Sequence, residues 1–182
     1  MAEITGRSVA FLLTDGYEDS ELTEPWAAVT AAGATAALVS PSTGTIHGKK
    51  GHSQSVDKAV AEVSADDFDA LVLPGGVVNA DHLRMSGEAV AFAKRFFEQG
   101  KPVGVICHGA WILIEADVVR DREITSYPSL RTDLLNAGAR WVDEEVVTDQ
   151  GLVSSRTPAD LSAFCAKVVE EIAEGVHAGQ HA

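Results

Sequence analysis

Short runs of apolar residues alternate with amphipathic segments along the whole chain. Three of these runs are apolar at nearly every position, and they span Ser8 to Thr14, Ala70 to Leu73 and Val103 to Ile106. Strands that are covered on both faces of a parallel sheet have this continuous apolar pattern. A fourth run covers Ala36 to Ser40. The pattern therefore predicts four buried strands.

Segments with helical spacing or helix-start signals lie between and after these strands. The first helix is expected to end near Gly33, with Thr23 as an N-cap candidate and Pro25 in its first turns. The remaining predicted elements are helices over 87–99, 129–137 and 159–174, a hairpin between Thr43 and Val56, and short β segments near 123–125, 141–148 and 152–155. Strands that alternate with helices form a parallel sheet flanked by helices, so the predicted fold is α/β and flavodoxin-like.

Length and composition fit one domain. The 182 residues are 46% hydrophobic and 23% charged, which is ordinary for a soluble globular protein. No linker or repeat divides the sequence, so we expect a single domain over 1–182, with an ordered core over 7–174 and a flexible tail over 175–182. The net charge of −13 argues against nucleic acid and anionic membrane as partners.

The sequence also bears on the compartment. No apolar run approaches the roughly 20 residues that cross a bilayer. The segment Met1 to Arg7 lacks the basic and apolar regions of a signal peptide. The two cysteines, Cys107 and Cys165, are expected to be free thiols, as is usual in a reducing compartment. Together these features predict a cytoplasmic protein.

The strand at Val103 to Ile106 stops at Cys107-His108-Gly109, and an apolar run with helical spacing begins at once. A thiol is therefore expected on a tight strand-to-helix turn, which is the geometry of a nucleophile elbow. The adjacent imidazole and the helix N-terminus are both expected to favour thiolate over thiol. The alternative is that Cys107 is a small buried hydrophobe, which is how we interpret Cys165 in its amphipathic helix.

Three strand ends carry polar or glycine-rich sequence, and in a parallel sheet these ends meet at one edge. They are the acidic turn at 15–19, Gly75-Gly76 and Cys107-His108. A protonated Glu18 could donate a hydrogen bond to the sulfur and act as general acid, although a loop carboxylate is usually only solvated. The N–H groups of Gly76 and His108 are candidate oxyanion donors. His108 is either a base or proton shuttle, or a residue that merely fills the turn.

Motifs for cofactors and metals are missing from the sequence. The segment that begins at Gly44 has one residue too few between its glycines for a phosphate loop and lacks a Ser or Thr after Lys49. His47 and His52 flank a basic turn, and we interpret them as surface residues because further ligand spacing is lacking. We therefore predict no cofactor and no metal.

A set of motifs runs through nearly the whole chain in order. The set comprises Gly16-Tyr-Glu-Asp19, Gly48-Lys-Lys-Gly51, Phe68 to Gly76, Asp81-His-Leu-Arg84, Gly100-Lys-Pro-Val103, Ile106-Cys-His-Gly109, Thr125-Ser-Tyr-Pro128 and Ser154-Ser-Arg-Thr-Pro158. In these motifs the chain resembles the PfpI family, in the superfamily of the class I glutamine amidotransferases. The resemblance implies a flavodoxin-like three-layer sandwich with a parallel sheet.

The resemblance also implies roles for particular residues. Glu18, Cys107 and His108 would form the catalytic site. Asp81 matches an acidic residue that orients the histidine of a neighbouring subunit, and Tyr127 matches a tyrosine that lines the same pocket. The functional unit would then be a homodimer or a higher homo-oligomer with the site near the interface.

The chain departs from the family pattern in two places. The family often has Pro-Gln after Cys-His-Gly, whereas this chain has Ala110-Trp111, and an indole there could reshape the pocket. The loop from Gly75 to Arg84 is one residue longer than usual. Amidotransferase chemistry is excluded, because its triad needs a histidine well downstream of the cysteine, and the only ones here lie in the tail after Gly175.

Three functions are compatible with these residues. The first is a cysteine-dependent, stress-protective hydrolase that acts on methylglyoxal or glyoxal adducts or on α-oxoaldehydes through the Cys107 thiolate. The second is an intracellular cysteine peptidase that uses Cys107 and His108 with an acidic residue of a neighbouring subunit. The third is a redox-sensing stress protein whose Cys107 is oxidised with little turnover. The expected partner is therefore a small-molecule or peptide substrate.

Overall fold

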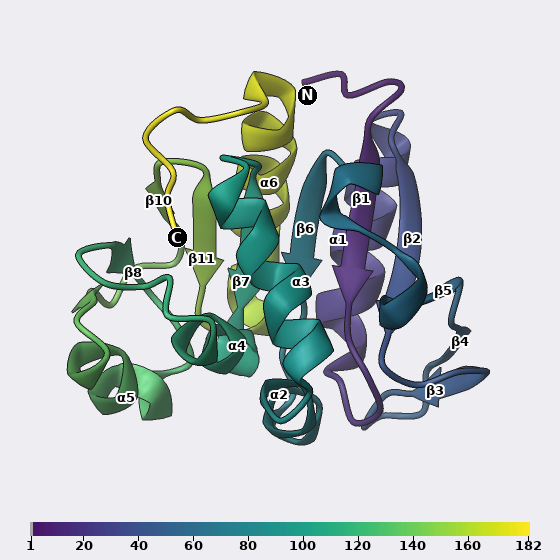
Figure 1. Ribbon diagram of the computed structural model, residues 1–182, viewed down its shortest axis with the longest axis horizontal. Coiled ribbons are helices and arrows are strands. Elements are labelled where there is room, and N and C mark those ends of the chain that lie inside the picture. The colour runs from purple at the N-terminus through teal and green to yellow at the C-terminus, as the bar shows by residue number, and fades with distance from the viewer. Residues whose placement is uncertain (1) are drawn as a thin grey trace.

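A seven-stranded sheet runs through the centre of the protein (Figure 1). We describe residues 2–182 of a computed structural model. Across the sheet the strands are β10 (Val147–Asp149), β11 (Leu152–Ser155), β7 (Val103–Ile106), β6 (Ala70–Leu73), β1 (Ser8–Leu12), β2 (Thr35–Ser40) and β5 (Lys58–Ala59). All neighbours pair in parallel except β10 with β11. The predicted α/β fold is confirmed.

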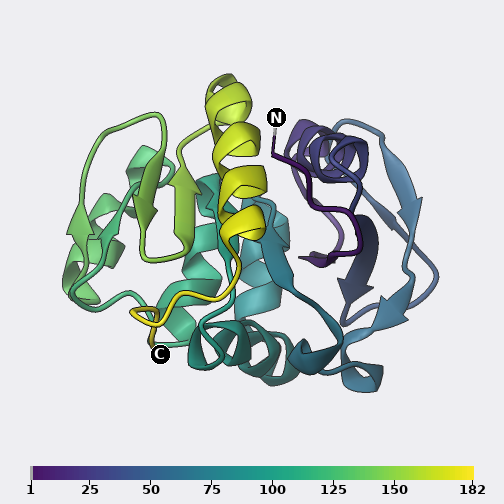
Figure 2. The same ribbon diagram turned by 90° about the horizontal axis from the view of Figure 1, so that it is seen from above.

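Helices cover both faces of this sheet, which gives three layers (Figure 2). The helices are α1 (Asp19–Ala31), α2 (Val77–Arg84), α3 (Gly87–Glu98), α4 (Ala110–Glu115), α5 (Arg131–Asn136) and α6 (Leu161–Glu174). Two small sheets lie outside the main one, the hairpin of β3 (Thr45–His47) with β4 (Ser53–Ser55) and the parallel pair β8 (Glu123–Ile124) with β9 (Arg140–Trp141). No helix of the described residues has the length and apolar character to cross a bilayer.

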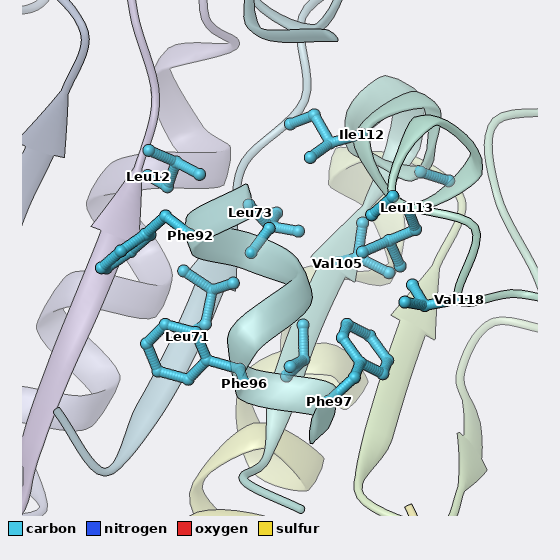
Figure 3. Close-up of a cluster of buried hydrophobic side chains, with 14 of the residues drawn as sticks. Leu12, Leu71, Leu73, Phe92, Phe96, Phe97, Val105, Ile112, Leu113 and Val118 are labelled. Atoms are coloured by element: carbon cyan, nitrogen blue, oxygen red, sulfur yellow. The ribbon is translucent and has the colours of Figure 1, made fainter. Parts of the chain in front are cut away.

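The apolar strands divide their side chains between two cores. Leu71 and Leu73 of β6 point toward α3 and α4, where they join Phe92, Phe96 and Phe97 (Figure 3). The alternate residues of β6 belong to the core under α1 and α6. Successive side chains of a strand point to opposite faces, so a strand that is apolar at every position feeds both cores. This is why the continuous apolar runs predicted these strands correctly.

Two sequence predictions about helices need correction. The first helix begins at Asp19 with Glu18 as its N-cap, and not at Thr23. Pro25 lies inside this helix, where its missing N–H removes the backbone bond to the carbonyl of Glu21. The short helix α2 was not predicted, because its apolar residues are few and its first turn follows the Gly75-Gly76 turn directly.

The side chain of Asn79 ties the ends of two strands together. Its Oδ1 accepts a hydrogen bond of 2.7 Å from the backbone N–H of Thr14, just after β1. Its Nδ2 donates to the carbonyls of Pro74 and Gly75, just after β6, at 3.1 and 2.9 Å. Asn79 is fully buried, so its side chain supplies partners to buried backbone groups that water does not reach, although the carbonyl of Gly75 also accepts from the N–H of Glu18 at 3.3 Å.

Asn79→Ala is therefore expected to destabilise the protein by about 2–4 kcal/mol, because it leaves buried backbone groups without partners. Urea unfolding followed by circular dichroism measures this. His82→Ala on the exposed side of the same helix is the matched control. A free energy of unfolding equal in the two variants would contradict the assignment.

The tail after α6 lies against the body of the protein, whereas the sequence predicted a flexible segment over 175–182. Gly175 has a φ of 84°, which lets the chain turn back at the end of the helix. The N–H of His177 then donates to the carbonyl of Gly100 at 2.8 Å. The buried guanidinium of Arg122 donates to the carbonyl of His181 at 2.5 Å. These bonds place the tail at the amino-terminal edge of the sheet.

Candidate active site

Cys107 stands on the turn that the sequence predicted. Strand β7 ends at Ile106, and a 3₁₀ turn over Cys107–Gly109 leads straight into α4. Cys107 has a φ of 61°, in the left-handed region that costs a non-glycine residue on the order of 1–3 kcal/mol. No side chain fits at Gly109, where a Cβ would lie 2.8 Å from the carbonyl oxygen of Leu73. The strained turn therefore holds the thiol at the carboxyl end of the central strand.

Two backbone amides point at the sulfur. The N–H groups of His108 and Gly76 both act to lower the pKa of the Cys107 thiol, which is only 8% exposed. These are the two amides that the sequence suggested as oxyanion donors, and the structure brings them to one point. Gly76 has a φ of 90°, and a Cβ there would lie 2.5 Å from the carbonyl oxygen of Gly16. Only glycine fits at that position.

The carboxyl group beside the sulfur belongs to Glu21, and not to Glu18 as predicted. Glu21 is fully buried, and its Oε2 accepts a hydrogen bond of 2.7 Å from the N–H of Gly75. Its carboxyl lies beside the thiol of Cys107, and the charge of the carboxylate acts on that thiol. A Cβ at Gly75 would collide with Glu21 Oε2 and lie 2.8 Å from Cys107 Cβ. The missing side chain of Gly75 thus makes room for this contact.

Glu18 faces the β3–β4 hairpin instead. Its carboxylate forms ion pairs with Lys49 and with Lys50, the latter at 2.6 Å. Burial acts to raise the pKa of Glu18, but the hydrogen bonds and charges of the two lysines outweigh it and hold that pKa below its usual range. The reason for the wrong prediction is the earlier start of α1, which makes Glu18 the N-cap and turns Glu21 inward.

The protonation of the thiol also differs from the prediction. Burial and the charge of the Glu21 carboxylate raise the pKa of Cys107 to about 12, although the two backbone N–H groups oppose this. The expected stabilisation of the thiolate by a helix N-terminus and an imidazole is not realised, because α4 has only six residues and the imidazole is uncharged at neutral pH. Burial likewise raises the pKa of Glu21 to about 7. At neutral pH the thiol of Cys107 therefore keeps its proton, while Glu21 is partly protonated.

Protonation of Glu21 makes ionisation of the Cys107 thiol easier. As a carboxylic acid, Glu21 carries no charge to repel a thiolate and can donate a hydrogen bond to it. Transfer of the thiol proton from Cys107 to an ionised Glu21 therefore produces the nucleophile, and the protonated Glu21 that results stabilises it without any third group. The arrangement can generate a thiolate when substrate arrives.

His108 lies beside the sulfur with its ring held on two sides. Nδ1 is 3.2 Å from Cys107 Sγ, and Nε2 is 3.4 Å from the hydroxyl oxygen of Ser129. The ring stacks on Tyr127 with centroids 4.5 Å apart and meets Trp111 edge-on at 5.3 Å. Burial, together with the charge of Lys49, lowers the pKa of His108. His108 is therefore a neutral imidazole that can accept a proton.

Trp111 forms a fixed wall of the site. Its indole N–H donates to the carboxylate of Asp133 at 3.0 Å, and the guanidinium of Arg84 lies 5.4 Å from its ring centroid. Where the family often has Pro-Gln, this chain has Ala110-Trp111, which places an indole ring against His108. Asp133 and Arg84 fix the position of that ring. Tyr127 is 39% exposed, so it forms the outer part of the same wall.

Asp81 is not brought to the histidine within this chain. It is exposed on α2, and its side chain has no hydrogen bond or ion pair with the residues described, 2–182. Three apolar side chains near it are also exposed, Val77 and Val78 on α2 and Met85 just after it. The role of Asp81 toward a neighbouring subunit stays a prediction.

Four site residues were not predicted from sequence. Glu21 and Asn79 depend on helix boundaries that the pattern did not give, and Ser129 reaches His108 only through the tertiary fold. Lys49 could have been identified from the sequence, since it lies in the Gly48–Gly51 motif. The hydrogen bond to Glu18 raises the pKa of Lys49, and the charge of Cys107 raises it further.

The fold and the site define a class. The protein is a single α/β domain that holds a cysteine on a strand-to-helix turn, with a carboxyl, an imidazole and two backbone amides around the sulfur. This is the arrangement of enzymes that use a thiol nucleophile.

Comparison with known proteins agrees with this class. The DJ-1/PfpI family matches residues 7–171. A deglycase of Pyrococcus horikoshii is 46% identical over 162 residues, which are 89% of this chain and 97% of that protein. The putative cysteine protease YraA of Bacillus subtilis is 45% identical over 159 residues, 87% of this chain and 94% of that one. The chain belongs to the DJ-1/PfpI family, as its motifs indicated.

A solved structure gives the same assignment. A two-domain protein from Anabaena variabilis, with a DJ-1/ThiJ/PfpI-like and a ferritin-like domain, superposes with a TM-score of 0.89 at 34% identity. The match covers 91% of this chain and 50% of that protein. This chain therefore spans half the length of that two-domain protein.

Proposed function

We propose that the protein is a cysteine-dependent hydrolase that acts on reactive carbonyl compounds, namely α-oxoaldehydes and their adducts with thiols and amines. The observation that carries the proposal is the pairing of Cys107 with Glu21, whose pKa of about 7 lets it exchange a proton at neutral pH. The name of the Pyrococcus horikoshii relative, a deglycase, supports the same reading.

The proposed reaction begins with an attack of the Cys107 sulfur on the aldehyde carbon of methylglyoxal. The thiol proton passes to Glu21, and the new oxyanion accepts hydrogen bonds from the N–H groups of Gly76 and His108. His108 then moves a proton from the aldehyde carbon to the neighbouring ketone carbon, and Glu21 returns its proton to the ketone oxygen. These transfers oxidise the first carbon and reduce the second. Water hydrolyses the resulting thioester, releasing lactate and the free thiol. No external oxidant is needed.

Peptide hydrolysis is the second candidate, and the putative cysteine protease among the relatives favours it. A cysteine peptidase needs an imidazolium to protonate the leaving amine. The lowered pKa of His108 disfavours that cation, and Ser129, its partner at Nε2, carries no charge. An acidic residue such as Asp81 from a neighbouring subunit would supply the missing charge, which makes this candidate dependent on a homodimer or higher oligomer.

The third candidate is a redox-sensing stress protein whose Cys107 is oxidised. Oxidation requires a thiolate that peroxide can reach. The sulfur is 8% exposed, and burial disfavours its ionisation. Oxidation of the thiol is therefore less favoured than turnover of a carbonyl substrate that enters the site. A cytoplasmic location fits any of the three candidates.

Incubating the purified protein with methylglyoxal, with methylglyoxal-treated N-acetylcysteine and with casein separates the candidates. We expect lactate from the first two substrates, detected by proton NMR, and no casein fragments. In D₂O the lactate should carry deuterium at the carbon that was reduced, if the proton exchanges with solvent on His108.

Casein cleavage without lactate would favour the peptidase. Lactate formation equal to that of Cys107→Ser protein would contradict the hydrolase. Sulfinic acid at Cys107 after mild peroxide, together with no turnover of any substrate, would favour the redox sensor.

A further inference from the structure

Three metal-ligating side chains converge at the end of α6, far from Cys107. They are Glu171 and Glu174 on the last turn of the helix and His177 in the tail. One ligand atom from each lies within 4.8 Å of the other two. Helix α6 ends near the amino-terminal edge of the sheet, while Cys107 lies at the carboxyl edge, so the two places are at opposite ends of the domain (Figure 1).

Two of these ligand atoms are buried without a hydrogen-bond partner. Glu171 is 5% exposed, and among residues 2–182 nothing donates a hydrogen bond to its Oε2. The same holds for Nε2 of His177, whose side chain is 18% exposed. The two atoms face each other at 3.1 Å without the geometry of a hydrogen bond. Buried polar atoms normally have partners, so these two atoms are available to bind a common ligand.

The spacing of the three atoms suits a small divalent cation. Ligands about 2.1 Å from a tetrahedral zinc ion lie about 3.4 Å apart. Glu171 Oε2 is 3.1 Å from His177 Nε2, and Glu174 Oε2 is 4.0 Å from it. These distances bracket the tetrahedral value, and the half-exposed Glu174 leaves a path for the ion and a place for a water ligand.

Backbone contacts fix the position of His177 beside Glu171 and Glu174. The positive φ of Gly175 turns the chain back, and the N–H of His177 donates to the carbonyl of Gly100 at 2.8 Å. The imidazole packs against Gly151, where a Cβ would lie 2.8 Å from the ring Cδ2. We predicted no metal from the sequence because ligand motifs were missing, and we expected His177 to lie in a flexible tail.

We propose that Glu171, Glu174 and His177 form a structural site for a first-row divalent cation, with Zn²⁺ as the preferred ion. One imidazole and two carboxylates suit zinc, whereas calcium and magnesium prefer oxygen ligands alone. The ion would fasten the tail over 175–182 to the end of α6 and would take no part in chemistry at Cys107.

Zinc binding to the full-length protein tests this. The protein is stripped with EDTA, and ZnCl₂ is titrated into it by calorimetry, both as wild type and as Cys107→Ser, which removes the thiol as a competing ligand. We expect one Zn²⁺ per chain in both proteins. At a 100-fold excess over Kd the Tm should rise by roughly 5 °C.

Two variants of the cluster have matched controls. Glu174→Gln alters an exposed ligand that the core does not need, and it should weaken zinc binding at least about tenfold. His177→Gln should abolish the zinc-dependent rise in Tm. Glu170→Gln on the same helix and His181→Gln in the same tail should bind zinc as the wild type does.

Several outcomes would overturn the proposal. One is the absence of stoichiometric zinc in the Cys107→Ser protein, and another is zinc binding that survives both cluster variants. A Tm that falls in His177→Gln but never responds to zinc would show that Glu171 and His177 form only an ion pair. Since these readouts do not involve turnover, they are independent of the proposed function.

Discussion

Replacing Cys107 with serine is expected to lower kcat/KM for methylglyoxal by roughly 10³-fold or more, while the fold is retained. The hydroxyl fits the space of the thiol and makes the same strained turn, so the backbone has no reason to move. A serine hydroxyl, however, cannot be ionised by a carboxylate whose pKa is about 7. The comparison requires rates at saturating and at low substrate, with circular dichroism to check the fold.

Cys165→Ser is the matched control for this variant. Cys165 is the second free cysteine, partly buried on α6, and burial raises its pKa to about 12 as well. A loss of turnover in Cys165→Ser, or a Cys107→Ser protein as active as wild type, would remove Cys107 from the chemistry.

Glu21→Gln is expected to lower kcat by about 10²- to 10³-fold, because an amide cannot exchange a proton with the sulfur or the substrate. The same variant should stabilise the protein at alkaline pH. Burial raises the pKa of Glu21 from 4.5 to about 7, so the folded state binds this proton more tightly than the unfolded state. The associated stability is present below pH 4.5 and is lost as the pH rises from 4.5 to 7.

Above pH 7 the buried charge thus costs the wild type about 3 kcal/mol relative to acidic solution. Glutamine has no charge to bury, so Glu21→Gln should be more stable than wild type at pH 8, with little difference at pH 4.5. Urea unfolding at both pH values measures this. An equal effect of pH on the two proteins would contradict the raised pKa of Glu21.

Glu18→Gln separates the two carboxyl groups. The Glu18 carboxylate pairs with Lys49 and Lys50. Loss of its charge should therefore weaken the contact with the β3–β4 hairpin, but it should leave the thiolate absorbance of Cys107 nearly as in wild type. If Glu18→Gln shifted that absorbance more than Glu21→Gln did, the assignment of the carboxyl beside the sulfur would be wrong.

The sheet and the cysteine turn could be predicted from sequence, because both depend on local patterns. A strand such as β6, buried on both faces, is apolar at every position, and a strand that stops at Cys107 with a helix beginning at once leaves only one shape for the turn. The family motifs then extended these local patterns to nearly the whole chain.

The partner of the sulfur could not be predicted, because it depends on where one helix begins. Thr23 and Pro25 form a familiar start signal, yet α1 begins four residues before Thr23 and tolerates the proline inside. That shift moves the inward-facing carboxyl from Glu18 to Glu21. Ser129 is a further example, since a hydroxyl 21 residues from His108 carries no sequence signal of its contact.

The folded-back tail has a consequence for how the protein is made and handled. His177 bonds to Gly100 and His181 to Arg122, so the amino-terminal edge of the sheet gains these bonds only after the chain has been synthesised through His181. Gln180 is buried in this contact. Truncating the last few residues, or fusing an affinity tag to them, would disturb packed structure. A tag on the amino terminus, where Ala2 and Glu3 are exposed, avoids this.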